Sequence, residues 1–157
     1  VIEQRIGARW HGMDIAYSAR SEKALPYRFI PDATALACHA DFLFVTAAAT
    51  PETRHIVNAK TLQALGADGF LINISRAANV DESALLDALE SRQIAGAALD
   101  VFDAEPHINP RFVPLQNVLL QPHHASATQQ TRRAMGQLMR DNLAAHFAGQ
   151  PLLTPVL

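Results

Sequence analysis

The sequence predicts an α/β fold built on a doubly wound parallel β-sheet. Continuous apolar runs of strand length recur at residues 41–45, 69–73, 95–102 and 118–120. Segments with the apolar spacing of amphipathic helices separate these runs, and polar residues follow the end of each. Buried strands that alternate with helices are typical of parallel sheets covered by helices. The 157 residues are enough for one domain with a sizeable core.

Composition narrows the class of function. The formal net charge of −2 gives no basic field for nucleic acid or an anionic membrane surface, so we expect a small-molecule ligand. The single cysteine, Cys38, cannot form an internal disulfide, and no CxxC pair suggests a metal site. No apolar run approaches the roughly 20 residues of a membrane span, and the first residues do not resemble a signal peptide. We therefore expect a cytoplasmic protein.

The first third of the chain predicts short elements. Ile2, Ile6 and Trp10 form one stripe of an amphipathic helix, which Gly12 ends. A short strand is expected at residues 13–17, a second at 27–30, and a brief helix at 34–39.

The remaining elements follow from the apolar runs. The run at residues 41–45 is typical of a strand buried on both faces, and the run at 69–73 repeats that pattern. Asp81 is a good N-cap for a helix over residues 82–91. The other predicted elements are a helix at 58–65, strands at 95–102 and 118–120, and a final helix at 129–147.

Three polar side chains follow successive predicted strands. These are Arg76, Glu105 and His123. Each has an ordinary alternative, because an arginine after a strand is often solvated, a glutamate before proline is often a turn residue, and a loop histidine can be structural. Ligands bind beyond the carboxyl ends of parallel strands, and a guanidinium, a carboxylate and an imidazole together can bind a ketoacid and move a proton.

These residues lie in segments that resemble a known family. Asn73-Ile-Ser-Arg76, Asp100-Val-Phe-Asp-Ala-Glu105-Pro and Gln121-Pro-His123-His are similar, in order, to three signatures of the D-isomer-specific 2-hydroxyacid dehydrogenases. Residues 45–58 and the C-terminal segment resemble the family as well. The Pro-His-His version and the lack of an acid after the second strand are most similar to the branch that reduces glyoxylate and hydroxypyruvate.

The resemblance implies a role for each residue and a Rossmann-like, dinucleotide-binding fold. Arg76 would hold the substrate carboxylate, His123 would be the acid and base, and Glu105 would orient the imidazole and favour its charged form. Asp100 matches a position that contacts the nicotinamide carboxamide. We assign the turn residues Ile74 and Ser75 to the cofactor site with it.

The segment after the second predicted strand favours NADP over NAD. NAD-preferring sites usually place an acidic residue there for the ribose 2′-hydroxyl. This chain has Ser18, Arg20 and Ser21 instead, a cation and two hydroxyls suited to a 2′-phosphate. A simply solvated Arg20 is the alternative.

The family's G-x-G-x-x-G phosphate loop does not occur among the seven glycines. Gly7 could end a degenerate motif, or residues 1–11 could be the tail of the helix that normally follows the loop, and the helical stripe favours the second. The first strand would then be missing from the centre of the sheet, which would leave two half-sheets. We expect a partial dinucleotide-binding domain over residues 1–157, without the family's substrate domain and inactive alone, that forms a homodimer or is completed by another polypeptide segment.

Two other functions remain open at this point. Transcriptional corepressors resemble the same family and retain its dinucleotide fold, so the chain could be a dinucleotide-sensing binding module without turnover. It could also be a truncated, inactive relic. The acid–base pair and the arginine do not exclude a binding role, because the corepressors have them too.

Overall fold

The computed structural model describes residues 12–155. These residues fall into two compact units that divide between Pro122 and His123. The helix predicted at residues 1–11 lies outside the described residues. Among the described residues, no helix combines the length and apolarity needed to cross a membrane.

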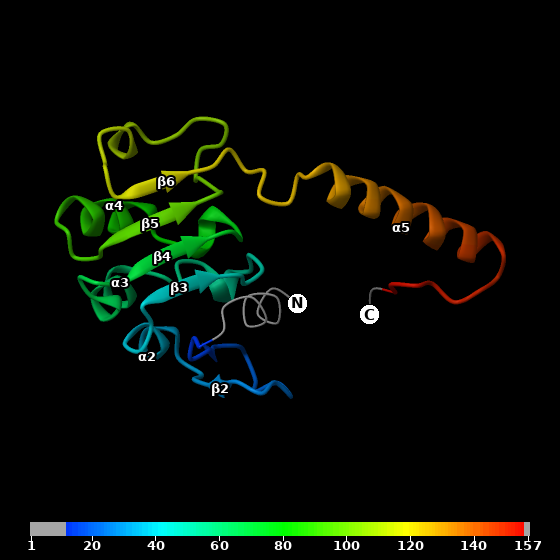
Figure 1. Ribbon diagram of the computed structural model, residues 1–157, viewed down its shortest axis with the longest axis horizontal. Helices are drawn as coiled ribbons and strands as arrows, with labels where there is room; N and C mark the ends of the chain where they lie inside the picture. Colours follow the sequence, from blue (N-terminus) through cyan, green and yellow to red (C-terminus); the bar gives the residue numbers. More distant parts are fainter. Residues whose placement is uncertain (1–11, 156–157) are drawn as a thin grey trace. The chain divides into compact units, whose positions relative to one another are not determined.

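The described part of the first unit contains two parallel sheets. β1 (Ala16–Tyr17) pairs with β2 (Arg28–Phe29) in one, and β3 (Phe42–Val45), β4 (Phe70–Asn73), β5 (Gly96–Leu99) and β6 (Val118–Leu120) follow in that order in the other (Figure 1). Every pair is parallel, which confirms the predicted α/β class. Among residues 12–155 the strands fall into two separate sheets, as predicted.

Three α-helices lie among the described residues of this unit: α2 (Ala33–Ala37), α3 (Ala59–Leu65) and α4 (Glu82–Glu90). A side chain caps the start of each, and the predicted cap of α4 is confirmed, because Asp81 accepts a hydrogen bond from the Ala84 amide. Leucines of α3 and α4 pack with strand residues such as Leu71 and Leu99 in one core. The shorter helical turns are η1 (Pro51–Thr53), η2 (Ala77–Asn79) and η3 (Pro110–Phe112).

The two faces of the larger sheet differ, so the prediction of strands buried on both faces is wrong for β3 and β4. Leu43 and Leu71 are buried, whereas Phe42 and Phe70 on the opposite face are 42% and 41% exposed. Their rings stack with centroids 5.5 Å apart. Gly96 stands beside this pair in register, where a Cβ atom would lie 3.2 Å from the Phe70 ring. The two phenylalanine rings therefore pack against each other on this partly exposed face of the sheet.

The second unit is built around α5 (Gln129–Phe147), which has the predicted bounds. Thr128 caps its start by accepting from the Thr131 amide. Asn142 of α5 binds the segment that follows the helix. Its Oδ1 accepts a hydrogen bond from the Leu153 amide at 3.0 Å, and its Nδ2 donates to Thr154 Oγ1 at 3.0 Å. No residue of α5 is buried within the described part of the chain.

Candidate active site

The turn that follows β4 carries Arg76, and buried polar side chains fix its backbone. Asn73, the last residue of β4, accepts from the amide and the hydroxyl of Ser75 and donates from Nδ2 to the Arg76 carbonyl at 3.1 Å. Arg76 Nη1 donates to the Ser75 carbonyl at 2.7 Å. Arg76 itself is exposed, so a rigid turn presents a charged fork to solvent at the end of a strand.

Asp100 lies beside this turn. It directly follows β5, it is 6% exposed, and its amide donates to the Asn73 carbonyl at 3.0 Å. The structure therefore brings the ends of β4 and β5 together, with the Arg76 turn on one and Asp100 on the other. The predicted contacts of Asp100, Ile74 and Ser75 with a cofactor stay predictions.

Glu105 stands on a tight turn after β5. Its Oε1 accepts from the Phe102 amide at 2.9 Å, which closes the turn, and a cis peptide bond joins it to Pro106. Glu82, the first residue of α4, was not singled out from the sequence. Its carboxylate accepts from the Asp103 amide at 3.2 Å and from Asn109 Nδ2 at 3.3 Å, so it ties the loop that carries Glu105 to the start of α4.

His123 is the first residue of the second unit, and its convergence with Arg76 and Glu105 stays a prediction. Its backbone is unusual, because φ is 52°, in the left-handed region that non-glycine residues rarely adopt. Such conformations cluster at functional sites, although His55 and Arg92 share this feature here.

The loop after β1 carries the residues predicted for the 2′-phosphate. Arg20 and Ser21 are exposed, whereas the Ser18 hydroxyl donates to the Pro31 carbonyl at 3.0 Å. Lys23 Nζ donates to Ser21 Oγ at 3.0 Å. Lys23 is therefore a second cation of this loop that the sequence pattern did not reveal, because it lies beyond the tetrapeptide of residues 18–21. Two cations and a hydroxyl on one loop fit a phosphate monoester.

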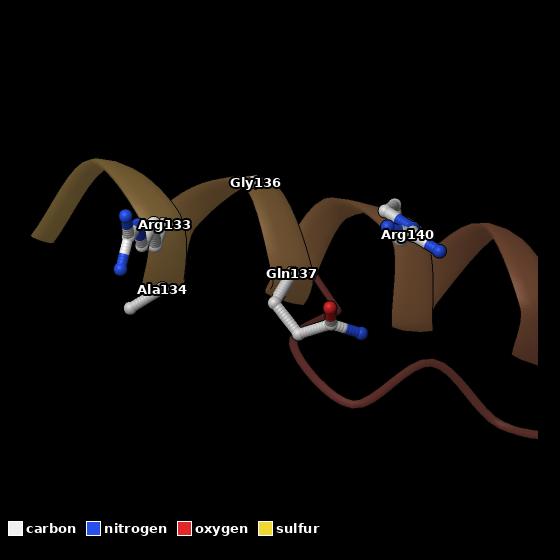
Figure 2. Close-up of a pocket in the computed structure, with 5 residues that line it drawn as sticks. All are labelled: Arg133, Ala134, Gly136, Gln137 and Arg140. Atoms are coloured by element: carbon white, nitrogen blue, oxygen red, sulfur yellow. The ribbon is translucent and has the colours of Figure 1, made fainter. Parts of the chain in front are cut away.

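Two hollows occur among the described residues, and neither is lined by Arg76, Glu105 or His123. One, of about 590 Å³, is an open depression along α5 lined by Arg133, Ala134, Gly136, Gln137 and Arg140, where Gln137 projects between the two arginines (Figure 2). The other, of about 10 Å³, lies in the first unit beneath Asn73 and Ala77 and has room for about one water molecule. Among residues 12–155 no cluster of three potential metal ligands occurs.

Residues 3–125 match the family described as D-isomer specific 2-hydroxyacid dehydrogenase, NAD binding domain. The chain belongs to this family. It is 48% identical to a 2-ketogluconate reductase of Gluconobacter oxydans over 99% of its own length and 50% of that protein. The chain spans about half the length of the curated relatives it matches.

Solved structures agree with the fold. A 2-hydroxyacid dehydrogenase from Ketogulonicigenium vulgare Y25 is 56% identical with a TM-score of 0.86, covering 98% of this chain and 48% of that one. An NADPH-dependent glyoxylate/hydroxypyruvate reductase from Sinorhizobium meliloti, solved with NADP and malonate, is 43% identical with a TM-score of 0.88, covering 99% and 48%. The Rossmann-like fold recognised from the three signatures is confirmed.

Proposed function

We propose that this chain is the C-terminal, cofactor-binding portion of a reductase that converts a small 2-ketoacid of the glyoxylate or hydroxypyruvate type to the D-2-hydroxyacid with NADPH. The observation that carries the proposal is the pinned Arg76 turn beside Asp100 at the shared end of β4 and β5. Ligands of open parallel sheets bind at this edge. The Sinorhizobium meliloti relative, described as NADPH-dependent, supports the choice of substrate and cofactor.

Each functional group has one task in this proposal. The Arg76 guanidinium binds the substrate carboxylate with two parallel hydrogen bonds and polarises the neighbouring carbonyl. His123 gives its proton to the carbonyl oxygen during reduction and takes it back during oxidation. Glu105 orients the imidazole and stabilises its charged form.

The cofactor is NADPH, with NADH as the weaker alternative. Arg20, Ser21 and Lys23 hold the 2′-phosphate, with Ser18 fixing the base of their loop, and Asp100, Ile74 and Ser75 contact the rest of the dinucleotide. When bound, the reduced nicotinamide supplies the hydride.

The substrate domain and the central strand come from another polypeptide segment or from a longer protein, and the complete enzyme is a homodimer in the cytoplasm. The division of the described strands into a group of two and a group of four supports a missing central strand, and the match to about half of each relative supports a missing domain. Residues 1–157 then form one partial dinucleotide-binding domain.

The test supplies the missing half. The first half of the Sinorhizobium meliloti reductase, up to the start of the matched region, is fused to this chain, and NADPH oxidation by glyoxylate is followed at 340 nm. We expect turnover by the chimera, none by the chain alone, and loss of roughly 10²–10⁴-fold in kcat for His123→Ala. The Sinorhizobium protein is the positive control, and Arg92→Ala is the control substitution.

Two results would contradict the proposal. Robust turnover by the isolated chain as a monomer would show that no completing segment is needed. A chimera that folds and binds NADPH but does not reduce glyoxylate or hydroxypyruvate would indicate a binding module instead of an enzyme.

A further inference from the structure

A wholly buried asparagine joins the Arg76 turn (residues 74–76) to the loop that follows β3 (the 46–50 loop). Asn79 Nδ2 donates to the Ala47 carbonyl at 2.7 Å and to Ser75 Oγ at 3.0 Å. Asn79 has an exposed fraction of 0%. Residues 47 and 79 are 32 positions apart in the chain, so this contact is a tertiary one.

The hydrogen bonds lead away from Asn79 on both sides, toward the 46–50 loop and toward the Arg76 turn. Because Asn79 gives both amide protons away, the Ser75 hydroxyl accepts from it and donates to Asn73 Oδ1 at 2.9 Å. Asn73 then donates from Nδ2 to the Arg76 carbonyl at 3.1 Å. The chain of donors links the 46–50 loop to the backbone of Arg76 without a gap, and linked hydrogen bonds of this kind reinforce one another.

Stability alone does not account for an asparagine here. The Asn79 Oδ1 atom is buried and has no hydrogen-bond partner in the part of the chain that the structure describes. Such an atom costs about 1–3 kcal/mol, which an apolar side chain of the same size would avoid. The two hydrogen bonds that Asn79 donates are therefore the contribution that an apolar side chain could not make at this position.

The two hydrogen bonds of the Asn79 side chain lie near the edge of the sheet where the strands end. Ala47 lies two residues beyond the end of β3, and Arg76 lies three residues beyond the end of β4. Further along the chain from each strand end, two backbone hydrogen bonds already join the same two connections. They run from the His55 amide to the Ala78 carbonyl and from the Val57 amide to the Asn79 carbonyl. The Asn79 side chain joins their parts nearest the sheet edge, where ligands of parallel sheets bind.

We propose that Asn79 is a positioning residue for 2-ketoacid binding. It holds the Arg76 turn at a fixed distance from the 46–50 loop, so that the guanidinium starts from a preorganised backbone. This inference rests on the role of Arg76 in the proposed function. The network itself does not depend on that role.

The first measurement concerns the network and uses no substrate. Asn79→Leu removes both donors with little change in volume, and hydrogen–deuterium exchange is followed in peptides from the 46–50 loop and the Arg76 turn of the full chain. We expect faster exchange in both peptides. Thr61→Val is the matched control, because Thr61 is also fully buried and donates to the Ile56 carbonyl, and the hydrogen bonds of its side chain within the described part of the chain reach neither segment. Asn79→Ala serves if the leucine variant does not fold.

The second measurement concerns substrate binding in the active chimera. We expect Asn79→Leu to raise KM for glyoxylate roughly tenfold with a smaller change in kcat, because a ground-state contact through Arg76 is loosened. A merely structural role would lower the melting temperature and leave KM of the folded fraction unchanged.

The outcomes separate the two proposals. Unchanged exchange in both peptides would overturn the role of Asn79 whatever the activity. Faster exchange with an unchanged KM would overturn the positioning role and leave the proposed function standing. An unsubstituted chimera that folds but shows no turnover would overturn the proposed function and, with it, the link to ketoacid binding, while the exchange data would still decide whether the network exists.

Discussion

Tyr17 and Lys23 are joined by two hydrogen bonds. The Tyr17 hydroxyl donates to the Lys23 carbonyl at 3.0 Å and accepts from the Lys23 amide at 2.7 Å. Tyr17 is the last residue of β1 and is 6% exposed, so the ring is anchored in the protein while its hydroxyl closes the loop. Residues 18–22, which include Arg20 and Ser21, are thereby held between two fixed points.

Arg20→Asp should raise KM for NADPH far more than KM for NADH, because the 2′-phosphate would lose a cation and meet a carboxylate. A hydrogen bond from the Thr50 side chain, with a smaller contribution from Arg20, holds the pKa of Glu52 below its ordinary value, so the substitution also removes a positive charge that this carboxylate interacts with. The active chimera gives the two KM values, and equal losses for both cofactors would defeat the assignment.

Tyr17→Phe should loosen the same loop without touching the phosphate-binding side chains. Removing the hydroxyl leaves the Lys23 amide and carbonyl without their partner, at a cost of about 1 kcal/mol in hydrogen bonding. We expect faster amide exchange at residues 18–23 in the variant than in the parent. The KM for NADPH should rise severalfold relative to the parent, and the KM for NADH should change less. Tyr27→Phe, at the chain's other tyrosine, is the control. Unaltered exchange would show that the loop holds its shape without the hydroxyl.

Arg111 should stabilise the first unit more at neutral pH than in acid. Its Nη2 lies 2.8 Å from Glu90 Oε2 and 2.7 Å from Asp87 Oδ1, linking η3 to α4. The hydrogen bond from Arg111 holds the pKa of Glu90 below its ordinary value of 4.5. A depressed carboxyl pKa contributes stability that is present above the ordinary value and is lost as pH falls through the folded one.

Melting curves of Arg111→Leu and its parent at several pH values test this. We expect a small difference in melting temperature at pH 7, since exposed ion pairs contribute little. The difference should shrink below pH 4.5, where Glu90 becomes protonated. Arg92→Leu is the control, and a difference that is independent of pH would contradict the electrostatic cause.

The pattern of apolar residues predicted the elements better than it predicted their surroundings. The bounds of β6 and α5 are as expected, but β1 spans only Ala16–Tyr17 of a predicted 13–17, because β2 offers just two residues to pair with. The exposure of Phe42 was not foreseen, since local sequence shows that a strand is apolar but not which layers cover it.

The residues of the candidate site also differ in how far the sequence could predict them. The positions of Arg76 and Asp100 followed from strand ends, because parallel strands place their carboxyl ends at one edge. Glu82 and Asn79 could not be found from sequence, since each acts through tertiary contacts with loops more than 20 residues away. Asn79 in particular looks like a turn residue, and only its burial between two loops shows otherwise.

Gly96→Ala should destabilise the larger sheet. A Cβ atom at this first residue of β5 would lie 2.6 Å from the Asn117 carbonyl oxygen and 3.2 Å from the Phe70 ring. The Ala97 amide donates to that same carbonyl, so the backbone at Asn117 cannot retreat without weakening the pairing of β5 with β6. Overpacking of this kind costs about 1–3 kcal/mol.

Chemical denaturation of the full chain, followed by fluorescence and circular dichroism, would give the free energy of unfolding. Gly136→Ala is the control of opposite sign, because no atom within 4 Å meets its added Cβ and alanine favours the interior of α5 by about 0.5–1 kcal/mol. We expect a lower free energy of unfolding for Gly96→Ala, because of its close contact, and a more stable α5 for Gly136→Ala. Equal stability of Gly96→Ala and its parent would contradict this prediction. It would mean that the backbone at Asn117 can shift to make room for the Cβ atom without weakening the pairing of β6 with β5.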